Sequence, residues 1–434
     1  MMGPGRSAPL TAGYASEPYW WDGVEFPDTA PDRPPTEADI VVVGAGYTGL
    51  AVAAEAAGLG RSVVVIDRDD PVRGASSRSG GMVLPGLKHD LATTLAMENG
   101  RALWDGTVAA VEDLAALIKQ HHVECDWRRS GHVELVHHPR MARRYQEVAR
   151  SFESIGEGAR FLGRDELGAE VGSERFHGAL VVDRSASLHP AKWAVALQSM
   201  ATAAGASVVG RCAARRIEKA AVGYRVDTER GPIRARDVVI ATNATTDTTL
   251  SPWLGRRILK IGSYIIATEP LDPDVATSLI PRGRMLFDSR NFLSYWRLSP
   301  DGRRMLFGGR TSFAPTTVER ARDRLYEVMT AVHPQLAGVA VDRAWGGDVA
   351  LTYDRMPHIG RHPVTGVVYA MGYCGSGVAL STRFGRVVAR HLAGGRDLGP
   401  FARLRWPAVP PPARVPGLLP FAGLWYLTRD AFGI

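Results

Sequence analysis

Cysteine is scarce in this chain, which has only Cys125, Cys212 and Cys374 among its 434 residues. The number is odd, the positions lie far apart and no CxxC pair occurs, so a disulfide framework and a structural zinc site are both disfavoured. We therefore expect no bound metal and a reducing, cytoplasmic location.

Long hydrophobic runs are also missing. No segment reaches the roughly 20 consecutive apolar residues that a membrane-spanning helix needs, and the N-terminus shows neither an apolar signal core nor a twin-arginine signal. The apolar stretch 415–427 is short and is interrupted by Pro416 and Pro420. We expect it to pack on the protein, with a peripheral membrane contact as the alternative.

No long run of one charge sign occurs, although the net charge is +7. The arginines are spread along the chain and basic runs such as Arg128-Arg129 are short. We therefore expect a solvated basic surface that attracts acidic substrates, and no nucleic-acid partner. A length of 434 residues with 45% hydrophobic residues favours a globular protein of two domains.

The most informative stretch is 38–82, which predicts a strand, a glycine loop, an alanine-rich helix and a second strand ending at Asp67. Gly44 permits the tight turn, Gly46 lets the backbone approach a pyrophosphate, and Gly49 lets the helix pack against the sheet. The helix N-terminus offers unpaired N–H groups to negative charge. Asp67 lies 23 residues after Gly44, where a ribose-binding carboxylate is expected, so the unit predicts adenine-dinucleotide binding. Further candidate contacts in the unit are Tyr47, Thr48 and Arg68.

A second segment of small polar residues, 74–81, indicates which dinucleotide to expect. It reads GASSRSGG and follows the second strand, where hydroxyls and backbone N–H groups can line a flavin and a pyrophosphate. A plain surface loop is the alternative, but NAD enzymes of the simple Rossmann type do not need such a segment. The candidate contacts here are Ser76, Ser77, Arg78, Ser79, Gly80 and Gly81.

With these two segments the chain closely resembles the D-amino-acid-oxidase-like superfamily of FAD-dependent oxidoreductases. The nearest branch is the γ-glutamylputrescine oxidase type, which carries similar GAGYTGL and GASxRxGG segments. The resemblance implies an α/β fold, with a Rossmann-like FAD-binding domain and a discontinuous substrate domain built on a mainly antiparallel sheet. It continues in order along most of the chain, at residues 188–192, 205–209, 238–244, 264–271, 306–310, 345–347, 354–360 and 372–377.

The expected domains are interleaved in the sequence. The FAD-binding domain is expected at 37–90, 186–250 and 345–400, and the substrate domain at 91–185 and 251–344. Residues 1–36 are expected to form an irregular arm pinned by Tyr19, Trp20 and Trp21, and residues 401–434 a Pro-rich extended tail. Periodicity predicts helices over 103–118, 318–332 and 378–392, and strands over 132–136, 292–298 and 305–309.

The resemblance also implies flavin contacts from later segments. Gly375 and Gly377 precede an apolar helix whose N-terminus is suited to stabilise the negative charge of a reduced flavin, although a simple strand–helix turn is the alternative. In the resembling family the position of Ser376 is often a histidine, so the role of this side chain stays open. The full set of later candidate contacts is Ala214, Thr242, Asn243, Gly346, Gly360, Gly375, Ser376, Gly377 and Val378.

Three departures from the family pattern shape the expected activity. Sarcosine oxidases attach flavin through a cysteine that would align with Gly347, so we expect noncovalent FAD. Glycine and D-amino-acid oxidases place a carboxylate-clamping arginine near Val349, and a valine makes no bidentate salt bridge, which favours an amine over an α-amino acid. Monomeric sarcosine oxidases carry an oxygen-activating lysine near Leu306, and its absence keeps a dehydrogenase as an alternative.

Five side chains are candidates for substrate contact or catalysis. Arg310 is the candidate for binding a distal carboxylate, and Tyr373 for shaping the flavin face. His358 is a candidate proton acceptor because neutral imidazole titrates near working pH. Tyr295 and Arg297, on the expected substrate-domain strands, complete the set. For each of them a packing role or a surface pair is the alternative.

These observations lead to one hypothesis and two alternatives. The hypothesis is FAD-dependent oxidation of a primary or secondary amine, γ-glutamylputrescine-like or related, to an imine, with oxygen as acceptor giving hydrogen peroxide. The first alternative is a flavin dehydrogenase that passes electrons to a quinone or protein acceptor. The second is a tRNA-modifying flavoprotein, which the basic charge would suit.

Overall fold

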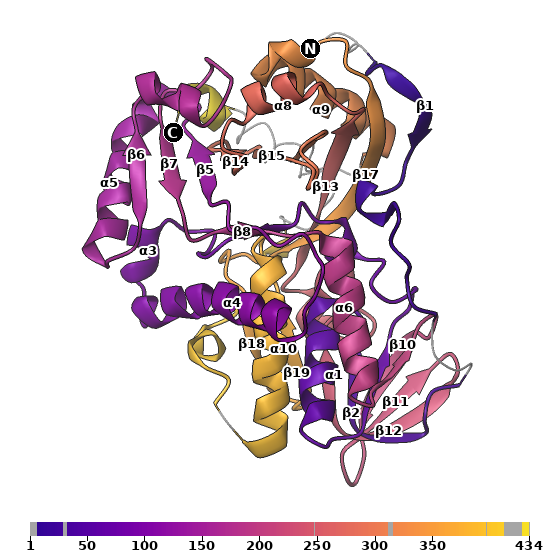
Figure 1. The fold of residues 1–434 in the computed structure, drawn as a ribbon. Coiled ribbons are helices and arrows are strands. Elements are labelled where there is room, and N and C mark those ends of the chain that lie inside the picture. The colour runs from indigo at the N-terminus through magenta and orange to yellow at the C-terminus, as the bar shows by residue number, and fades with distance from the viewer. Residues whose placement is uncertain are drawn as a thin grey trace.

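The computed structural model describes residues 7–28, 33–246, 248–310, 316–395, 397–411 and 428–433. Two large sheets organise the chain, one in the lower and one in the upper part of Figure 1. The lower sheet is largely parallel and the upper one largely antiparallel. This architecture confirms the expected α/β fold class.

The lower sheet forms the Rossmann-like domain. Its parallel strands lie in the order β19-β12-β2-β3-β9, and an antiparallel extension, β10 and β11, continues from β12. Strands covered on both faces read as near-continuous apolar runs, which explains the sequences IVVV and VVVI in β2 and β3. The bounds are β2 (Glu37–Val43), β3 (Val63–Ile66), β9 (Ser207–Val209), β10 (Ala214–Lys219), β11 (Tyr224–Thr228), β12 (Gly231–Ile240), β18 (His358–Arg361) and β19 (Val368–Met371).

Helices α1 (Tyr47–Gly58), α6 (Pro190–Ala203) and α10 (Gly377–Gly394) lie side by side against this sheet (Figure 1). Helix α4 (Gly100–Gln120) packs on α10, and its apolar stripe, which includes Val111 and Leu114, enters the same core. The sequence division assigns 91–185 to the substrate domain, whereas the packing groups α4 with the Rossmann-like core.

The upper sheet has the order β1-β17-β13-β16-β15-β14-β5-β7-β6, and only the pairs β1–β17 and β14–β5 are parallel. Helix α9 (Val318–Val332) covers one face, over a core that contains Trp296, Phe307 and Met329. The bounds are β1 (Leu10–Ala15), β5 (His132–Leu135), β6 (Ala159–Leu162), β7 (Ala179–Val182), β13 (Leu259–Thr268), β14 (Met285–Asp288), β15 (Ser294–Leu298), β16 (Met305–Gly309) and β17 (Val341–Leu351).

Shorter helices and strands complete the two parts. They are α2 (Ala75–Arg78), β4 (Met82–Val83), α3 (Leu91–Leu95), α5 (Ala142–Ser154), β8 (Ala186–Ser187), α7 (Pro252–Gly255) and α8 (Pro273–Leu279). The helix predicted over 318–332 has the bounds of α9, whose start is set by the Thr317 hydroxyl accepting from the Arg320 N–H. The other predicted helices and strands occur as α4, α10, β5, β15 and β16, with ends that agree to within a few residues.

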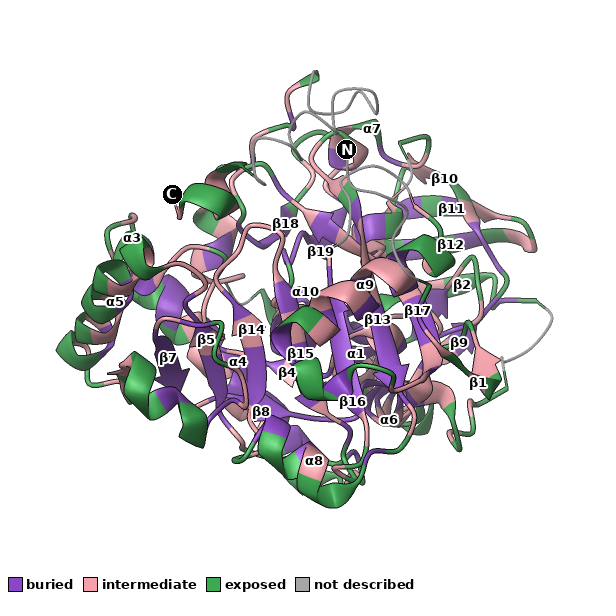
Figure 2. Ribbon diagram, turned by 90° about the horizontal axis from the view of Figure 1, so that it is seen from above, coloured by how far each residue is buried: buried purple, intermediate pink, exposed green. Residues whose placement is uncertain are grey.

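Figure 2 shows the strands buried at the centre and exposed helical faces toward the rim. Near the C-terminus, Trp406 is buried beneath the Rossmann-like sheet. Farther on, the Asp430 carboxylate accepts from the backbone N–H groups of Asn291 and Phe292 at 2.7 and 3.0 Å. The stretch 415–427 lies outside the described residues. Within the ranges described, no helix is long and apolar enough to cross a membrane.

Candidate functional site

A cavity of about 700 Å³ lies along the carboxyl ends of the parallel strands, between the Rossmann-like domain and the long strands β13 and β17. This edge is where ligands bind in open α/β sheets. Most of the sequence-predicted cofactor residues line it: Gly44, Gly46, Tyr47, Thr48, Asp67, Arg68, Ser76, Arg78, Ser79, Ala214, Thr242, Asn243, Gly346, Gly375, Gly377 and Val378.

The glycine loop between β2 and α1 is too tightly packed for side chains. Gly44 has φ +109°, and a Cβ there would lie 2.8 Å from the Ala241 carbonyl oxygen. Gly49 does not line the cavity, and its Cβ would lie 1.9 Å from the Gly44 carbonyl oxygen. The loop therefore brings bare backbone and the first turn of α1 to the cavity wall, as a bound pyrophosphate requires.

Asp67, at the end of β3, holds this loop as well as lining the cavity. Its carboxylate accepts from the Ala45 N–H at 2.7 Å and from the Asp69 N–H at 3.0 Å. Burial raises the pKa of Asp67 while these backbone donors oppose the rise. Next to it, the exposed Arg68 side chain pairs with Asp69 at 3.4 Å at the same end of the cavity.

The second segment is fastened to the glycine loop and to β17. The Ser76 hydroxyl accepts from the Tyr47 N–H at 3.0 Å, which connects α2 to the start of α1. The Arg78 guanidinium donates to the Arg73 carbonyl at 2.8 Å and to the Gly346 carbonyl at 3.3 Å. Burial and the neighbouring Arg73 cation lower the pKa of Arg78.

Five further predicted contacts do not line the cavity. The Ser77 hydroxyl accepts from the Trp21 indole N–H at 3.0 Å, and Gly80 lies under the Tyr295 ring. A Cβ on Gly81 would lie 2.2 Å from the Leu188 carbonyl oxygen, and one on Gly360 would lie 2.7 Å from the Tyr369 hydroxyl. Ser376 is the N-cap of α10 without a side-chain cap bond, between two glycines that do line the cavity. We propose packing or turn roles for these five.

The start of α10 forms a further part of the cavity wall, beside the start of α1. Gly375 has φ +104° and turns the chain, so that Gly377 and Val378 bring the first turn of this 18-residue helix to the wall. The Tyr373 hydroxyl lies 2.7 Å from the Thr48 hydroxyl, connecting this turn to α1, and burial raises the pKa of Tyr373. The Asn243 side chain accepts from the Gly372 N–H at 2.9 Å.

Two of the predicted catalytic side chains lie beside the second segment, outside the cavity lining. The Tyr295 ring packs between Gly80 and Gly308, and its hydroxyl lies 3.0 Å from the Ser263 hydroxyl. The buried Arg297 donates to the carbonyls of Leu188 and Gly81 at 3.1 and 3.3 Å, and burial lowers its pKa to about 10. Arg297 is therefore used in holding backbone, and we propose a positioning role for it.

His358 is buried away from the cavity. Its ring stacks on Trp406 with centroids 4.5 Å apart, and its Nε2 lies 3.1 Å from the Asp354 carboxylate. Desolvation lowers the pKa of His358, and Asp354 opposes this. Because Trp406 covers the ring, we propose that His358 packs the Rossmann-like domain rather than accepting a proton from substrate.

The structure also places the three positions at which the sequence departs from the resembling oxidases, namely Gly347, Val349 and Leu306. Gly347 and Val349 line the cavity from β17, and Asp348 between them pairs with Lys260 at 2.6 Å. Leu306 is buried in an apolar cluster with Trp20 and Trp345. Among the described residues no group of three or more His, Cys, Asp or Glu side chains is arranged to hold a metal ion.

Two charged residues, Lys88 and Glu134, are absent from the sequence-based set, although that set contains their neighbour Arg310. Lys88 lies within electrostatic range of Arg310, Glu134 and Cys374, and burial together with the Arg310 cation lowers its pKa. The Tyr145 hydroxyl donates to the Glu134 carboxylate, and burial raises the pKa of Glu134. These five residues come from five different elements or loops, so no local pattern could have grouped them.

Comparison with known proteins agrees with this geometry. The sequence pattern of the DAO family, described as FAD dependent oxidoreductase, matches residues 39–391. The chain is 30% identical over 404 residues to gamma-glutamylputrescine oxidoreductase of Escherichia coli strain K12, covering 91% of this chain and 93% of that one. It is also 30% identical over 380 residues to the probable oxidoreductase OrdL of Haemophilus influenzae, covering 86% and 87%. The crystal structure of glycine oxidase from Geobacillus kaustophilus has the same fold, with a TM-score of 0.73 at 22% identity over 86% of this chain and 99% of that one.

Proposed function

Because the chain belongs to the DAO family of FAD-dependent oxidoreductases, we propose that it oxidises a primary or secondary amine carrying a carboxylate remote from the reacting nitrogen. Among such substrates a γ-glutamylated amine fits best. The name of the E. coli relative, gamma-glutamylputrescine oxidoreductase, refers to a compound of this class. The product is an imine, which hydrolyses to a carbonyl compound and an amine or ammonia.

The residues of the cavity fit FAD. The side-chain-free loop at Gly44 and Gly46 would hold the pyrophosphate, Asp67 the ribose, and the segment Ser76–Ser79 the flavin side of the molecule. Bound FAD would accept a hydride equivalent from the substrate carbon that is bonded to the reacting nitrogen. With glycine at 347 and no thiol there, we propose that the cofactor is held noncovalently.

The first turn of α10 supports this assignment on electrostatic grounds. Its unpaired N–H groups and the helix dipole face the cavity at Gly377 and Val378 and favour negative charge there. Oriented backbone groups need no rearrangement when charge develops, which makes them effective in a site shielded from water. We propose that this turn stabilises the reduced cofactor.

The single observation that carries the substrate class is Val349, which lines the cavity where an α-carboxylate clamp would be. Lys88 and Arg310 lie outside the cavity lining, but Lys88 is within electrostatic range of Arg310 and of Cys374, which lines the cavity. We propose that Arg310, supported by Lys88, binds the remote carboxylate, and that Glu134 faces a cationic part of the substrate.

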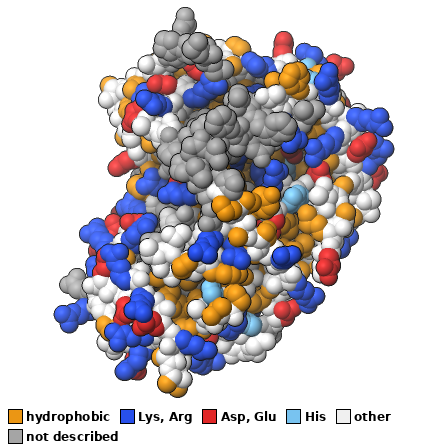
Figure 3. All heavy atoms as spheres, turned by 180° about the vertical axis from the view of Figure 1, so that it is seen from behind, with side chains coloured by type: hydrophobic (Ala, Val, Ile, Leu, Met, Phe, Trp, Pro, Cys, Tyr) orange, Lys and Arg blue, Asp and Glu red, His pale blue; other side chains and the backbone are white. Residues whose placement is uncertain are grey.

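We propose oxygen as the electron acceptor, with hydrogen peroxide as product, and a cytoplasmic location. The dehydrogenase alternative remains the second candidate because the buried Leu306 stands where a monomeric sarcosine oxidase has its lysine. On the face shown in Figure 3, Lys and Arg side chains are dispersed with Asp and Glu among them rather than gathered in one basic patch. This dispersion disfavours the tRNA-modifying alternative.

The decisive experiment is anaerobic reduction of the enzyme-bound flavin by a panel of amines. γ-Glutamylated amines should bleach the flavin faster than unmodified polyamines, N-methyl amino acids, glycine or D-alanine. Admitting oxygen afterwards should restore the yellow colour within the turnover time and release peroxide. Fast bleaching by glycine or D-alanine alone would overturn the substrate class, and slow reoxidation by oxygen with fast reoxidation by a quinone would establish a dehydrogenase.

A further inference from the structure

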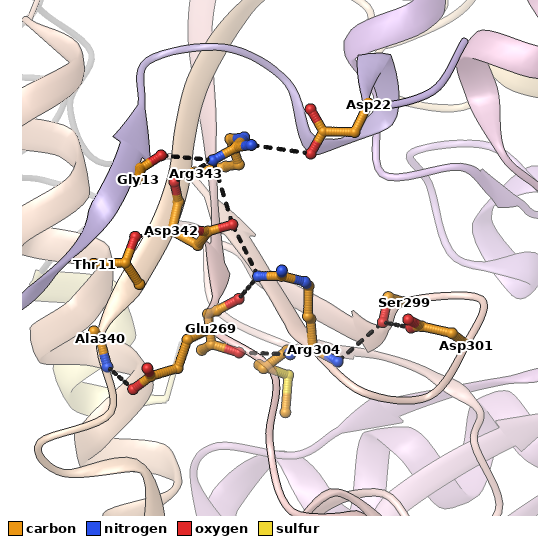
Figure 4. Close-up of polar contacts among 12 residues, drawn as sticks. Thr11, Gly13, Asp22, Glu269, Ser299, Asp301, Arg304, Ala340, Asp342 and Arg343 are labelled. Carbon is orange, nitrogen blue, oxygen red and sulfur yellow. Dashed lines mark hydrogen bonds and ion pairs between the residues drawn. The ribbon is translucent and has the colours of Figure 1, made fainter.

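The N-terminal arm, residues 7–28, is anchored to the upper sheet. Its strand β1 pairs with β17, and the Thr11 hydroxyl donates to the Asp342 carboxylate at 2.8 Å. Arg343 on β17 donates to the Gly13 carbonyl at 3.0 Å and pairs with Asp22 at 3.2 Å (Figure 4). These contacts fix both ends of the segment that carries Trp20 and Trp21.

Trp20 fixes the middle of the arm. Its side chain is fully buried, in an apolar cluster with Ala191, Ile265 and Trp345, and its ring lies 4.9 Å from that of His189. The same Trp345 donates its indole N–H to the Arg78 carbonyl at 2.8 Å. The arm and the end of α2 therefore share one supporting residue.

Trp21, the next residue, contacts the second cofactor segment directly. Its indole N–H donates to the Ser77 hydroxyl at 3.0 Å. Its ring lies 4.5 Å from the guanidinium carbon of Arg73 and 4.5 Å from that of Arg78. Phe26 covers Arg73 from another side, with its ring centroid 3.4 Å from the guanidinium carbon. Helix α2 is thus held by the arm through Ser77 and by the glycine loop through Ser76.

The two arginines need such support. Both line the cofactor cavity, and each lies close enough to the other for the Arg73 charge to lower the pKa of Arg78. Like charges that are partly withdrawn from water repel, and long side chains that are not held turn outward to solvent. An aromatic face attracts a guanidinium group, so Trp21 offsets the repulsion between the two and restricts their orientation.

We propose that Trp21 is a positioning residue for FAD: by holding Arg73, Arg78 and Ser77, the N-terminal arm keeps the second cofactor segment in its binding geometry and so determines FAD affinity. This proposal requires only that the cavity binds FAD and is independent of the amine that is oxidised. Its test is therefore a binding measurement, and no turnover is needed.

The experiment compares Trp21→Ala, Trp21→Phe and a matched control, Trp253→Ala. Trp253 is also half-buried and also stacks on an arginine, with the Arg257 guanidinium carbon 3.8 Å from its ring, but it does not line the cavity. Apoprotein of each variant is titrated with FAD by flavin fluorescence quenching. In parallel, the melting temperature is measured with and without saturating FAD, because a ligand raises it in proportion to its binding free energy.

Trp21→Ala should weaken FAD binding roughly 10- to 100-fold, since it removes two cation–π contacts and a hydrogen bond. Trp21→Phe, which keeps a ring, should recover most of the affinity. Trp253→Ala should lower the melting temperature with and without FAD alike and leave the dissociation constant unchanged. Wild-type FAD affinity in Trp21→Ala, or an equal loss in Trp253→Ala, would overturn the proposal. If Trp21→Ala fails to fold, Trp21→Leu takes its place, because leucine also lacks the ring and the indole N–H. Wild-type FAD affinity in Trp21→Leu would then overturn the proposal.

Discussion

Gly49→Ala is the substitution for which the structure makes the sharpest prediction. An added Cβ would lie 1.9 Å from the Gly44 carbonyl oxygen and 3.1 Å from a Val42 methyl carbon. Real Cβ atoms essentially never approach closer than 3.0 Å, so α1 and the loop must separate by about 1 Å. Both the carbonyl and the helix are backbone, so no flexible side chain can move aside to absorb the clash.

The backbone that Gly49→Ala would displace lies where the cofactor is expected to bind. Overpacking of this kind costs about 1–3 kcal/mol. Because the Gly44 turn and the first turn of α1 both line the cavity, we expect much of this cost to appear as weaker FAD binding. Two kcal/mol corresponds to roughly a thirtyfold higher dissociation constant. Apoprotein reconstitution followed by flavin fluorescence measures this constant directly.

The matched control is Gly58→Ala, at the other end of the same helix. No atom lies within 4 Å of a Cβ at this position, and alanine favours a helix over glycine by about 0.5–1 kcal/mol. Gly58→Ala should therefore bind FAD like the wild type and melt slightly higher. Full flavin occupancy and wild-type affinity in Gly49→Ala would refute the reasoning about the loop.

Three further predictions follow from the site and the core. Mild acid denaturation should release the flavin into the supernatant, because Gly347 offers no thiol for attachment; a coloured pellet would contradict this. Arg310→Leu should raise KM more than it lowers kcat for a carboxylate-bearing amine, with a roughly ten- to hundredfold loss in kcat/KM, and steady-state kinetics with a substrate lacking the carboxylate serve as the control. Burial lowers the pKa of His132 to about 3 from 6.5, so below pH 6.5 the unfolded state binds a proton that the folded state does not, and stability falls from pH 6.5 toward 3. Denaturant unfolding should show His132→Gln losing less stability than wild type across that window, and equal slopes would contradict it.

The sequence by itself determined those features of the fold that depend on residues close to one another in the chain. The turn at Gly44, the start of α1 at Tyr47 and the acid at Asp67 belong to one contiguous unit, in which each residue packs against or bonds to near neighbours. Strand and helix periods depend on local geometry as well, which is why α9 could be predicted to the residue. The family pattern extends over the same ordered motifs, and membership of the family implies the FAD cofactor and the α/β fold.

Only the tertiary structure decided which distant segments meet. A periodic pattern shows that α4 has an apolar face, but not that this face packs on α10 rather than in the upper domain. The stacking of Trp406 on the His358 ring, from which we propose a packing role for this histidine, also joins segments that no local pattern connects. Lys88 and Glu134, or Trp21 and Arg78, come together because strands and helices far apart in the chain are brought into contact by burial of apolar surface. That contact is a property of the whole packed chain and not of any segment within it.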